Sequence, residues 1–268
     1  MYTNADSLAN KMGDLNCFIK SLLRKPNVIA ITEVNSKNPN ITLNISELHL
    51  TGYNIFHSIE SQGHRGVVIY VSSDLNCQQV YFSDLHKDSV IVKIKLSNGQ
   101  LLHIANIYRS PSSGKDVTES ICNLLNRLME QVHNHVLIVG DFNFPDIDWN
   151  SCHSCSNDLC STIFLDTIQN NFLNQYVDFP TRIRGSDTPH ILDLVLADVP
   201  LIERIDYLAP LGKSDHSVLL IKTSVLGSRE QMSPKYNLAK GDYNSFREHM
   251  AIDWENFFQD CNNDVETM

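Results

Sequence analysis

Short apolar runs rich in β-branched residues recur along this chain of 268 residues and constrain its fold more than any other feature. Runs of this length, bounded by Gly, Pro, Asn or Asp, are typical of buried strands. They cover residues 27–33, 66–71, 90–96, 101–107, 135–139, 191–196, 202–208 and 217–223. Asn98-Gly99 stands between two of them and predicts a tight hairpin, so that pair of strands should be antiparallel.

Helical periodicity occurs in fewer places. Apolar residues spaced three and four apart predict a helix that starts at Asp6, with Asp6 or Ser7 as its N-cap, and ends before Pro26. The same spacing predicts helices over 117–132 and 163–170 and a shorter one over 243–250. Strands outnumber helices, and hairpins lie beside longer crossovers. We therefore expect an α/β fold in which helices flank a mixed sheet or a pair of sheets.

The regular pattern weakens after Thr223, and residues 227–231 have the composition of a linker. We expect one domain over 1–226, followed by a linker and partly helical tail over 227–268. The apolar runs are far shorter than the roughly 20 residues of a membrane-spanning helix, so no membrane passage is expected.

Charge and cysteine usage limit the class of protein. The formal net charge is −10, which repels polyanions at long range, so any nucleic-acid site must rest on local positive charge or on a metal. Seven cysteines, an odd number spread over a long chain, indicate reduced thiols. With a polar N-terminal sequence that lacks a secretory signal, these thiols favour an intracellular protein.

Acidic residues stand where strands end. Glu33, Asp141 and Asp215 each lie at the edge of an apolar run, and Asp193 lies inside one. Taken singly, each is commonly a turn residue or a helix cap. Together they predict a metal site, because several buried carboxylates are costly unless they are paired or bound to a cation. The ligands are hard oxygens, so the expected ion is Mg²⁺ or Mn²⁺.

Two motifs carry the expected chemistry. Asp141 and Asn143 are two residues apart just past a strand, so their side chains should point the same way, one toward an attacking water and the other toward a phosphate. His216 follows Asp215, and Asp193 could fold back to orient its imidazole. A histidine steered by a carboxylate gains the basicity to stabilise charge on a phosphoryl oxygen.

Six motifs occur in a fixed order along the chain: 2–8, Ile31-Thr32-Glu33, Ile107-Tyr108-Arg109, Gly140-Asp141-Phe142-Asn143, 191–196 and Ser214-Asp215-His216. Together they resemble the endonuclease/exonuclease/phosphatase superfamily. More narrowly, the chain resembles the apurinic-endonuclease-like nuclease domain of non-LTR (LINE-type) retrotransposons, near the jockey-like branch. Phe179-Pro180-Thr181-Arg182 is typical of those elements, as is Tyr236-Asn237 followed by the segment 242–247.

The resemblance implies a four-layered α/β sandwich, with two mostly antiparallel mixed sheets packed face to face and helices outside. It implies a divalent-metal-dependent endonuclease that nicks DNA, leaves 3′-hydroxyl and 5′-phosphate ends and so primes reverse transcription. The expected partners are double-stranded DNA and a reverse transcriptase domain of the same element. We expect a monomer that acts in the nucleus after import from the cytoplasm.

The family's roles carry over onto matching positions. Glu33 would be the main metal ligand, with Asn4 and Asp215 assisting. Asp141 would activate the attacking water. The scissile phosphate would be held by Asn143 and Tyr108, His216 paired with Asp193 would stabilise the transition state, and Ser214 would fix the phosphate or the loop. Further substrate contacts are expected from Arg109, Thr181 and Arg182. A rim of loop cations that also includes His64, Arg65, Arg184 and Lys213 could surround the acidic centre.

Two departures from the family pattern bear on activity. Only three residues precede Asn4, so the first strand is truncated, and Asp6 stands where many relatives carry Arg. An abasic-site repair nuclease, a phosphoinositide phosphatase or a sphingomyelinase would share the same acidic and amide residues. A remnant that binds DNA without cleaving it is the alternative from another class.

Overall fold

The computed structural model describes residues 1–38, 40–59, 64–82, 86–131, 135–156, 158–183, 188–229, 241–251 and 253. The chain divides into two units, Met1–Glu230 and Gln231–Met268. Within the residues described, no helix combines the length and the apolar character needed to cross a membrane.

The first sheet has six strands in the order β13-β14-β1-β2-β4-β3. Neighbouring strands pair antiparallel except β1 and β2, which are parallel. The strands are β1 Tyr2–Asn4, β2 Val28–Thr32, β3 Tyr53–His57, β4 Val67–Ser72, β13 Ile202–Leu208 and β14 Val218–Thr223.

The second sheet also has six strands, in the order β11-β12-β8-β7-β6-β5. Here β7 and β8 are the parallel pair, and the predicted hairpin at Asn98-Gly99 joins antiparallel β6 and β7. The strands are β5 Cys77–Val80, β6 Ser89–Lys95, β7 Leu101–Tyr108, β8 His135–Asp141, β11 Asn174–Gln175 and β12 Asp193–Ala197, and a separate small pair comprises β9 Ile147–Asp148 and β10 His153–Ser154.

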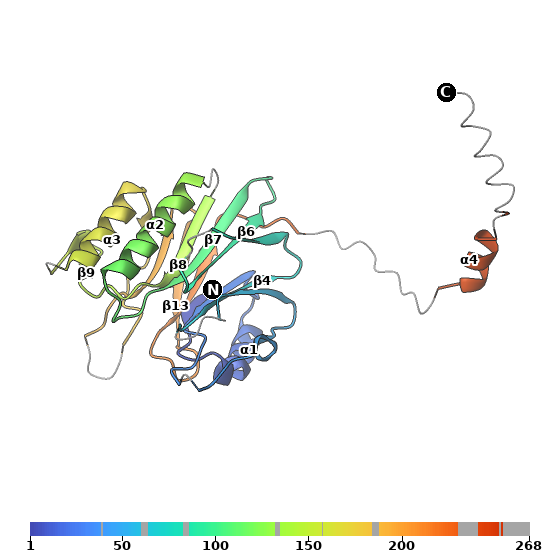
Figure 1. The fold of residues 1–268 in the computed structure, drawn as a ribbon, viewed down its shortest axis with the longest axis horizontal. Coiled ribbons are helices and arrows are strands. Elements are labelled where there is room, and N and C mark those ends of the chain that lie inside the picture. The colour runs from blue at the N-terminus through green and yellow to red at the C-terminus, as the bar shows by residue number, and fades with distance from the viewer. Residues whose placement is uncertain are drawn as a thin grey trace, which may run out of the picture. The chain divides into compact units, whose positions relative to one another are not determined.

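Three apolar clusters hold the layers together. One lies between the inner faces of the two sheets, from Val67 and Val90 to Leu219. Another packs helices α2 (Lys115–Gln131) and α3 (Leu159–Asn170) on the outer face of the second sheet, and a third packs α1 (Met12–Ser21) on the outer face of the first. Figure 1 shows α2 and α3 side by side, with α1 on the far side of the sandwich. The fold is the expected four-layered α/β sandwich.

The first helix begins later than expected. Asp6 and Ser7 have φ of 42° and 81° and do not cap it; a short 3-10 helix, η1 (Ala9–Lys11), precedes α1. The reason is that this segment continues the pairing of β1. The amides of Ala5, Ser7 and Leu8 donate to the carbonyls of residues 32–34, so the backbone there cannot wind into a helix.

The short first strand is held on both sides. Tyr2, Thr3 and Asn4 pair with Ala30, Ile31 and Thr32 of β2, and Tyr2 also pairs with Leu219 of β14. All three residues are fully buried. These pairings on both sides fix Asn4 in the middle of the first sheet.

Several smaller elements complete the chain. Strands β3, β5 and β11 were not predicted from the sequence, because they lie at sheet edges or carry polar residues. A second 3-10 helix, η2, covers Ile45–Leu48. Gly227 and Arg229 form bridges with Leu96 and Leu75, which extends the first unit past the expected boundary at 226.

The second unit contains helix α4, Tyr243–His249, near the predicted 243–250. The Asp242 carboxylate caps it by accepting hydrogen bonds from the amides of Asn244 and Ser245. Tyr236-Asn237, one of the segments that carried the resemblance, lies outside the described residues.

Candidate active site at one edge of the sandwich

A polar pocket opens where the strands of both sheets end together. The parallel pairs β1/β2 and β7/β8 place Asn4, Glu33, Tyr108 and Asp141 at the same edge, since parallel strands end on the same side. The loop before β14 adds Ser214, Asp215 and His216 to this edge. Of the predicted site residues, Asn4, Glu33, Tyr108, Asp141, Asn143, Arg182, Ser214, Asp215 and His216 line the pocket.

The predicted pairing of His216 with Asp193 is present. Nδ1 of His216 lies 2.7 Å from Oδ2 of Asp193, and both side chains are buried. Asp193 stands opposite Asp141 in the antiparallel register of β12 and β8, so the two carboxylates and the imidazole form one cluster. Nε2 of His216 lies 3.9 Å from Oδ2 of Asp141. The free edge of the imidazole therefore faces the carboxylate expected to activate water.

Burial and charge shift the pKa values of this cluster. Burial disfavours the charged imidazolium, but the charge and hydrogen bond of Asp193 outweigh it and raise the pKa of His216 to about 10. Burial and the neighbouring charge of Asp193 raise the pKa of Asp141 to about 8. In its ionised form, a carboxylate with a raised pKa is a stronger proton acceptor from water than an ordinary aspartate.

Asn4 holds two carboxylates in place. Its Oδ1 accepts a hydrogen bond of 3.0 Å from the backbone N–H of Asp6, which can only donate, so the amide nitrogen must face the other way. That nitrogen donates to Oε1 of Glu33 at 3.1 Å and to Oδ2 of Asp141 at 2.8 Å. Asn4, predicted to assist the metal, here orients the carboxylates, while its oxygen faces the backbone.

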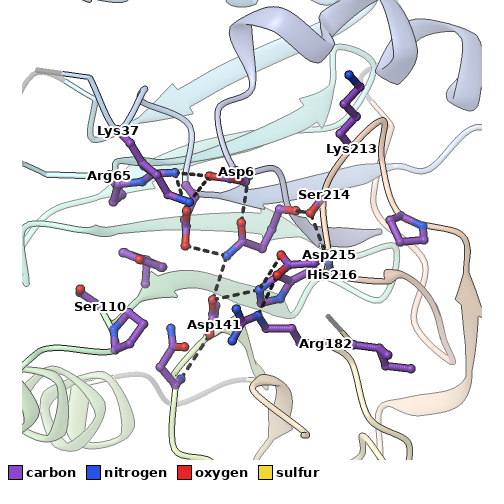
Figure 2. A pocket seen from close by; sticks show the side chains of 17 residues that line it. Asp6, Lys37, Arg65, Ser110, Asp141, Arg182, Lys213, Ser214, Asp215 and His216 are labelled. Carbon is purple, nitrogen blue, oxygen red and sulfur yellow. Dashed lines mark hydrogen bonds and ion pairs between the residues drawn. The ribbon is translucent and has the colours of Figure 1, made fainter. Parts of the chain in front are cut away.

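Two loop cations cover the Glu33 side of the pocket. Arg65 contacts both Glu33 and Asp6, and Lys37 lies 2.9 Å from Asp6 (Figure 2). The charges of Lys37 and Arg65 outweigh partial burial and lower the pKa of Asp6. Arg65 was foreseen only as one cation of a rim, and Lys37 was missed. The sequence contained a sign of this arrangement, because an acidic residue at position 6 favours basic residues beside it.

Tyr108, at the end of β7, and Asn143, in the loop that follows β8, line the same pocket. Burial and the nearby carboxylates of Glu33 and Asp141 raise the pKa of Tyr108 well above its usual value, so its hydroxyl remains a donor. Asn143 adopts a φ of 51°, donates its amide to the carbonyl of Arg109 at 2.7 Å and donates its backbone N–H to Asp141. The loop is thereby tied to the carboxylate it follows.

The loop before β14 is fastened to the first sheet. Ser214 donates its hydroxyl to the carbonyl of Asn4 at 2.7 Å and accepts the N–H of His216. Asp215 forms an ion pair of 3.0 Å with Arg182 at the pocket wall (Figure 2). Ser214 thus fixes the loop, one of the two roles foreseen for it. Arg184, also expected in the rim, lies outside the described residues.

Arg109 and Thr181, two residues expected to contact substrate, do not line the pocket. Arg109 is buried, donates to the carbonyls of Ser113 and Asn143 and lies over the ring of Phe144 at 4.2 Å. Thr181 is fully buried, and its hydroxyl accepts the N–H of Asp193 at 3.0 Å. A contact of either side chain with substrate stays a prediction. Arg109 braces the loop with Asn143, and Thr181 fixes the start of β12.

The donor set fits a hard divalent cation. Glu33, Asp141 and Asp215 present carboxylate oxygens to one pocket. Burial and then the charge of Asp193 raise the pKa of Asp141, and a bound cation would offset both. Asp141, Asp193 and His216 are also close enough to hold an ion together. However, Asp193 is fully buried and does not line the pocket, whereas Glu33 does. Glu33 and its pocket neighbours are therefore the better ligands.

The architecture and the pocket together define the fold of the endonuclease/exonuclease/phosphatase nucleases. Three solved structures illustrate it: the endonuclease domain of TRAS1, a telomere-specific non-LTR retrotransposon, and AP endonucleases from Archaeoglobus fulgidus and Leishmania major. Their TM-scores are 0.62, 0.58 and 0.61 and their sequence identities 19%, 17% and 15%; the matches cover 83%, 84% and 82% of this chain and 97%, 99% and 86% of theirs.

A comparison with protein families adds a more particular likeness. Residues 102–220 match the family described as "Endonuclease-reverse transcriptase". This segment runs from β7 to β14 and contains Tyr108, Asp141, Asn143, Asp193 and His216. No curated protein matches the chain in sequence. The resemblance drawn from the sequence is confirmed by this family and by the fold.

Proposed function

We propose that the chain is a divalent-metal-dependent DNA endonuclease that hydrolyses one phosphodiester bond and leaves 3′-hydroxyl and 5′-phosphate ends. The observation that carries the proposal is the buried His216–Asp193 pair facing Asp141 across a pocket lined with oxygen ligands. Such a pocket fits an in-line attack on phosphorus, which needs a base on one side and positive charge around the phosphoryl oxygens.

Each residue has a defined task in this reaction. Asp141 takes a proton from the attacking water, whose oxygen bonds to phosphorus as the bond to the 3′ oxygen breaks. The 3′ oxygen leaves with the electron pair of that bond and takes up a proton from solvent to become the 3′-hydroxyl. Protonated His216, kept charged by Asp193, stabilises the negative charge that builds on the phosphoryl oxygens. Tyr108 and Asn143 hold the phosphate, and Arg182 provides a contact at the pocket wall.

Glu33 would hold Mg²⁺ or Mn²⁺, with Asp215 assisting and Asn4 orienting the carboxylates. The bound ion would act as a Lewis acid toward the phosphoryl oxygen and the leaving group. The local cations Arg65, Lys37, Arg182 and Lys213 line the same pocket and offset the net negative charge of the chain where DNA would approach.

The context proposed for this activity is a retrotransposon. The matched family and the likeness to the TRAS1 domain support a nuclease whose nick primes reverse transcription by a reverse transcriptase domain of the same element. Its substrate would be double-stranded DNA, and we propose that it acts in the nucleus after import from the cytoplasm. We propose that the nuclease works as a monomer.

Plasmid nicking tests the proposal. Supercoiled plasmid incubated with the purified chain should give open circles with Mg²⁺ or Mn²⁺ and none with EDTA. Asp141→Asn and His216→Ala should each reduce the rate by about 10²- to 10³-fold, the usual cost of losing one electrostatic or acid–base group. End mapping should find 3′-hydroxyl and 5′-phosphate.

Parallel substrates decide among related activities. A duplex with one abasic site that is cut far faster than the intact plasmid would replace the proposal by a repair nuclease. Phosphate release from a phosphoinositide in the absence of nicking would replace it by a phosphatase. A folded chain that binds DNA but cuts none of these substrates with metal would be a binding remnant.

A further inference from the structure

Tyr2 is a buried polar residue that the roles above leave unused. It lies on β1, its side chain is fully buried, and its ring belongs to the apolar cluster between the two sheets. Its hydroxyl nevertheless donates a hydrogen bond of 2.7 Å to Oδ1 of Asp193, on the other sheet. A buried hydroxyl in an apolar layer is costly unless it is hydrogen-bonded, so this contact selects a specific geometry.

Further hydrogen bonds extend from both ends of the contact between Tyr2 and Asp193. Oγ1 of Thr32 lies 3.0 Å from the Tyr2 oxygen, and because the tyrosine proton points to Asp193, the threonine donates in this pair. On the other side, Oδ2 of Asp193 accepts from Nδ1 of His216. Thr32, Tyr2, Asp193 and His216 therefore form one buried hydrogen-bonded chain that crosses from the first sheet to the second.

The hydrogen bond from Tyr2 fixes the rotation of the Asp193 carboxylate. A carboxylate can rotate about its last bond, and only one orientation keeps Oδ2 on Nδ1 of His216. Thr181 holds the backbone of Asp193 but does not contact its carboxylate oxygens. Within the described part of the chain, Oδ1 has one hydrogen-bond donor, which is Tyr2.

We propose that Tyr2 is a positioning residue for His216 and acts through Asp193. The inference rests on the proposed function, in which His216 stabilises the transition state. Tyr2 touches no substrate and lies behind the pocket wall. Its effect is to hold the imidazole at the angle from which Nε2 faces the pocket and Asp141.

The test removes one oxygen atom. Tyr2→Phe keeps the ring in the core and deletes the donor to Asp193. Tyr70→Phe is the matched control, because Tyr70 is equally buried and its hydroxyl bonds the carbonyl of Leu48, on the outer face of the first sheet. Thermal unfolding of both variants identifies a temperature at which both are folded.

The first measurement uses the metal-free protein in EDTA. The Nδ1 proton of His216 should give a downfield proton NMR signal, assigned by its absence in His216→Gln. Tyr2→Phe should shift or broaden this signal, while Tyr70→Phe should leave it in place. An unchanged signal in Tyr2→Phe would overturn the inference, whether or not the protein cuts DNA, so its failure is distinct from failure of the proposed function.

The second measurement is kinetic. With Mg²⁺ and a nickable duplex, Tyr2→Phe should lower kcat by about tenfold with KM unchanged, less than the 10²–10³-fold expected for loss of a group that acts directly. In an Asp193→Asn background the same change should have no further effect, since residues that act through one another are not additive. Equal kcat values for Tyr2→Phe and Tyr70→Phe would overturn the inference.

A second variant covers the case in which Tyr2→Phe does not fold. Thr32→Val keeps a β-branched side chain on β2 and removes the hydroxyl that donates to Tyr2. It should move the His216 signal in the same direction as Tyr2→Phe but less. A signal identical to that of the unaltered chain would show that the hydrogen-bonded chain does not set the imidazole.

Discussion

The two sides of the pocket contain the same kinds of charge in opposite surroundings. On one side the side chains of Asp141, Asp193 and His216 are at most 6% exposed. On the other, Glu33 and Arg65 are 12% and 15% exposed, and the ion pairs continue outward to Lys37, which is 73% exposed. We call these the buried side and the rim.

The difference shows what burial contributes to a charged site. On the buried side the carboxylates of Asp141 and Asp193 accept hydrogen bonds from Asn4, Tyr2 and His216. Water cannot replace a lost partner there, so the geometry is fixed and electrostatic effects are strong. On the rim, ion pairs compete with water and salt and are worth little individually. The buried side is suited to chemistry on one phosphate, and the rim to a variable contact with a polyanion.

The largest effect is expected when His216, on the buried side, loses the carboxylate of Asp193. Asp193→Ala removes the carboxylate beside buried His216 and leaves Nδ1 of the imidazole without its hydrogen-bond acceptor. We expect the free energy of unfolding to fall by about 3–5 kcal/mol, as for other broken buried pairs, and nicking to be lost. Urea denaturation monitored by circular dichroism measures the first effect. Asp193→Asn, which keeps the shape, should be less destabilised; an equal loss in both would assign the effect to packing.

The pH dependence of stability tests the raised pKa of His216. A raised pKa in the folded state means that stability from this group is complete below the unfolded value near 6.5 and is lost as the pH rises through about 10. In EDTA, the free energy of unfolding should therefore fall between pH 8 and pH 10. His216→Gln cannot bind the proton and should show a smaller fall. Parallel curves for the two proteins would contradict the charge assignment.

Arg65 marks the border between the two sides. Arg65→Met keeps much of the side-chain volume but removes the cation that contacts Glu33 and Asp6. We expect binding of a DNA duplex, measured by fluorescence anisotropy in EDTA, to weaken by about three- to tenfold, as one phosphate-facing charge is lost, and to become less dependent on salt. Unchanged DNA binding, with the same salt dependence, would show that Arg65 holds Glu33 in place and does not contact DNA.

The smallest effect is expected at the outer rim. Lys37→Ala deletes an exposed partner of Asp6, and exposed pairs contribute roughly 0–1 kcal/mol. Stability should change by less than about 0.5 kcal/mol, and DNA binding by less than in Arg65→Met. A Lys37 effect as large as that of Arg65 would mean that the border between buried side and rim lies farther out than the exposed fractions indicate.

Sequence patterns predicted the parts that depend on neighbours along the chain. The hairpin at Asn98-Gly99, the helices α2 and α3 and most strands followed from local periodicity. The acidic residues at strand ends pointed to one edge of the sheets, and the pairing of His216 with Asp193 was expected from their chemistry. The helix predicted from Asp6 was wrong because residues 5–8 pair with 32–34, a contact that local periodicity does not contain.

Tertiary structure decided which way the remaining side chains face. Arg109 and Thr181 belong to motifs with site residues, yet one lies over Phe144 and the other holds β12, because the strand register turns them away from the pocket. Tyr2 and Asp193 are 191 residues apart, and only the packing of two sheets brings their oxygens to 2.7 Å. Sequence alone thus determined which residue types are available and where strands end. The long-range packing of the sheets determined which of them meet, since a contact across the core depends on register and on the facing layer, and neither is encoded within one strand.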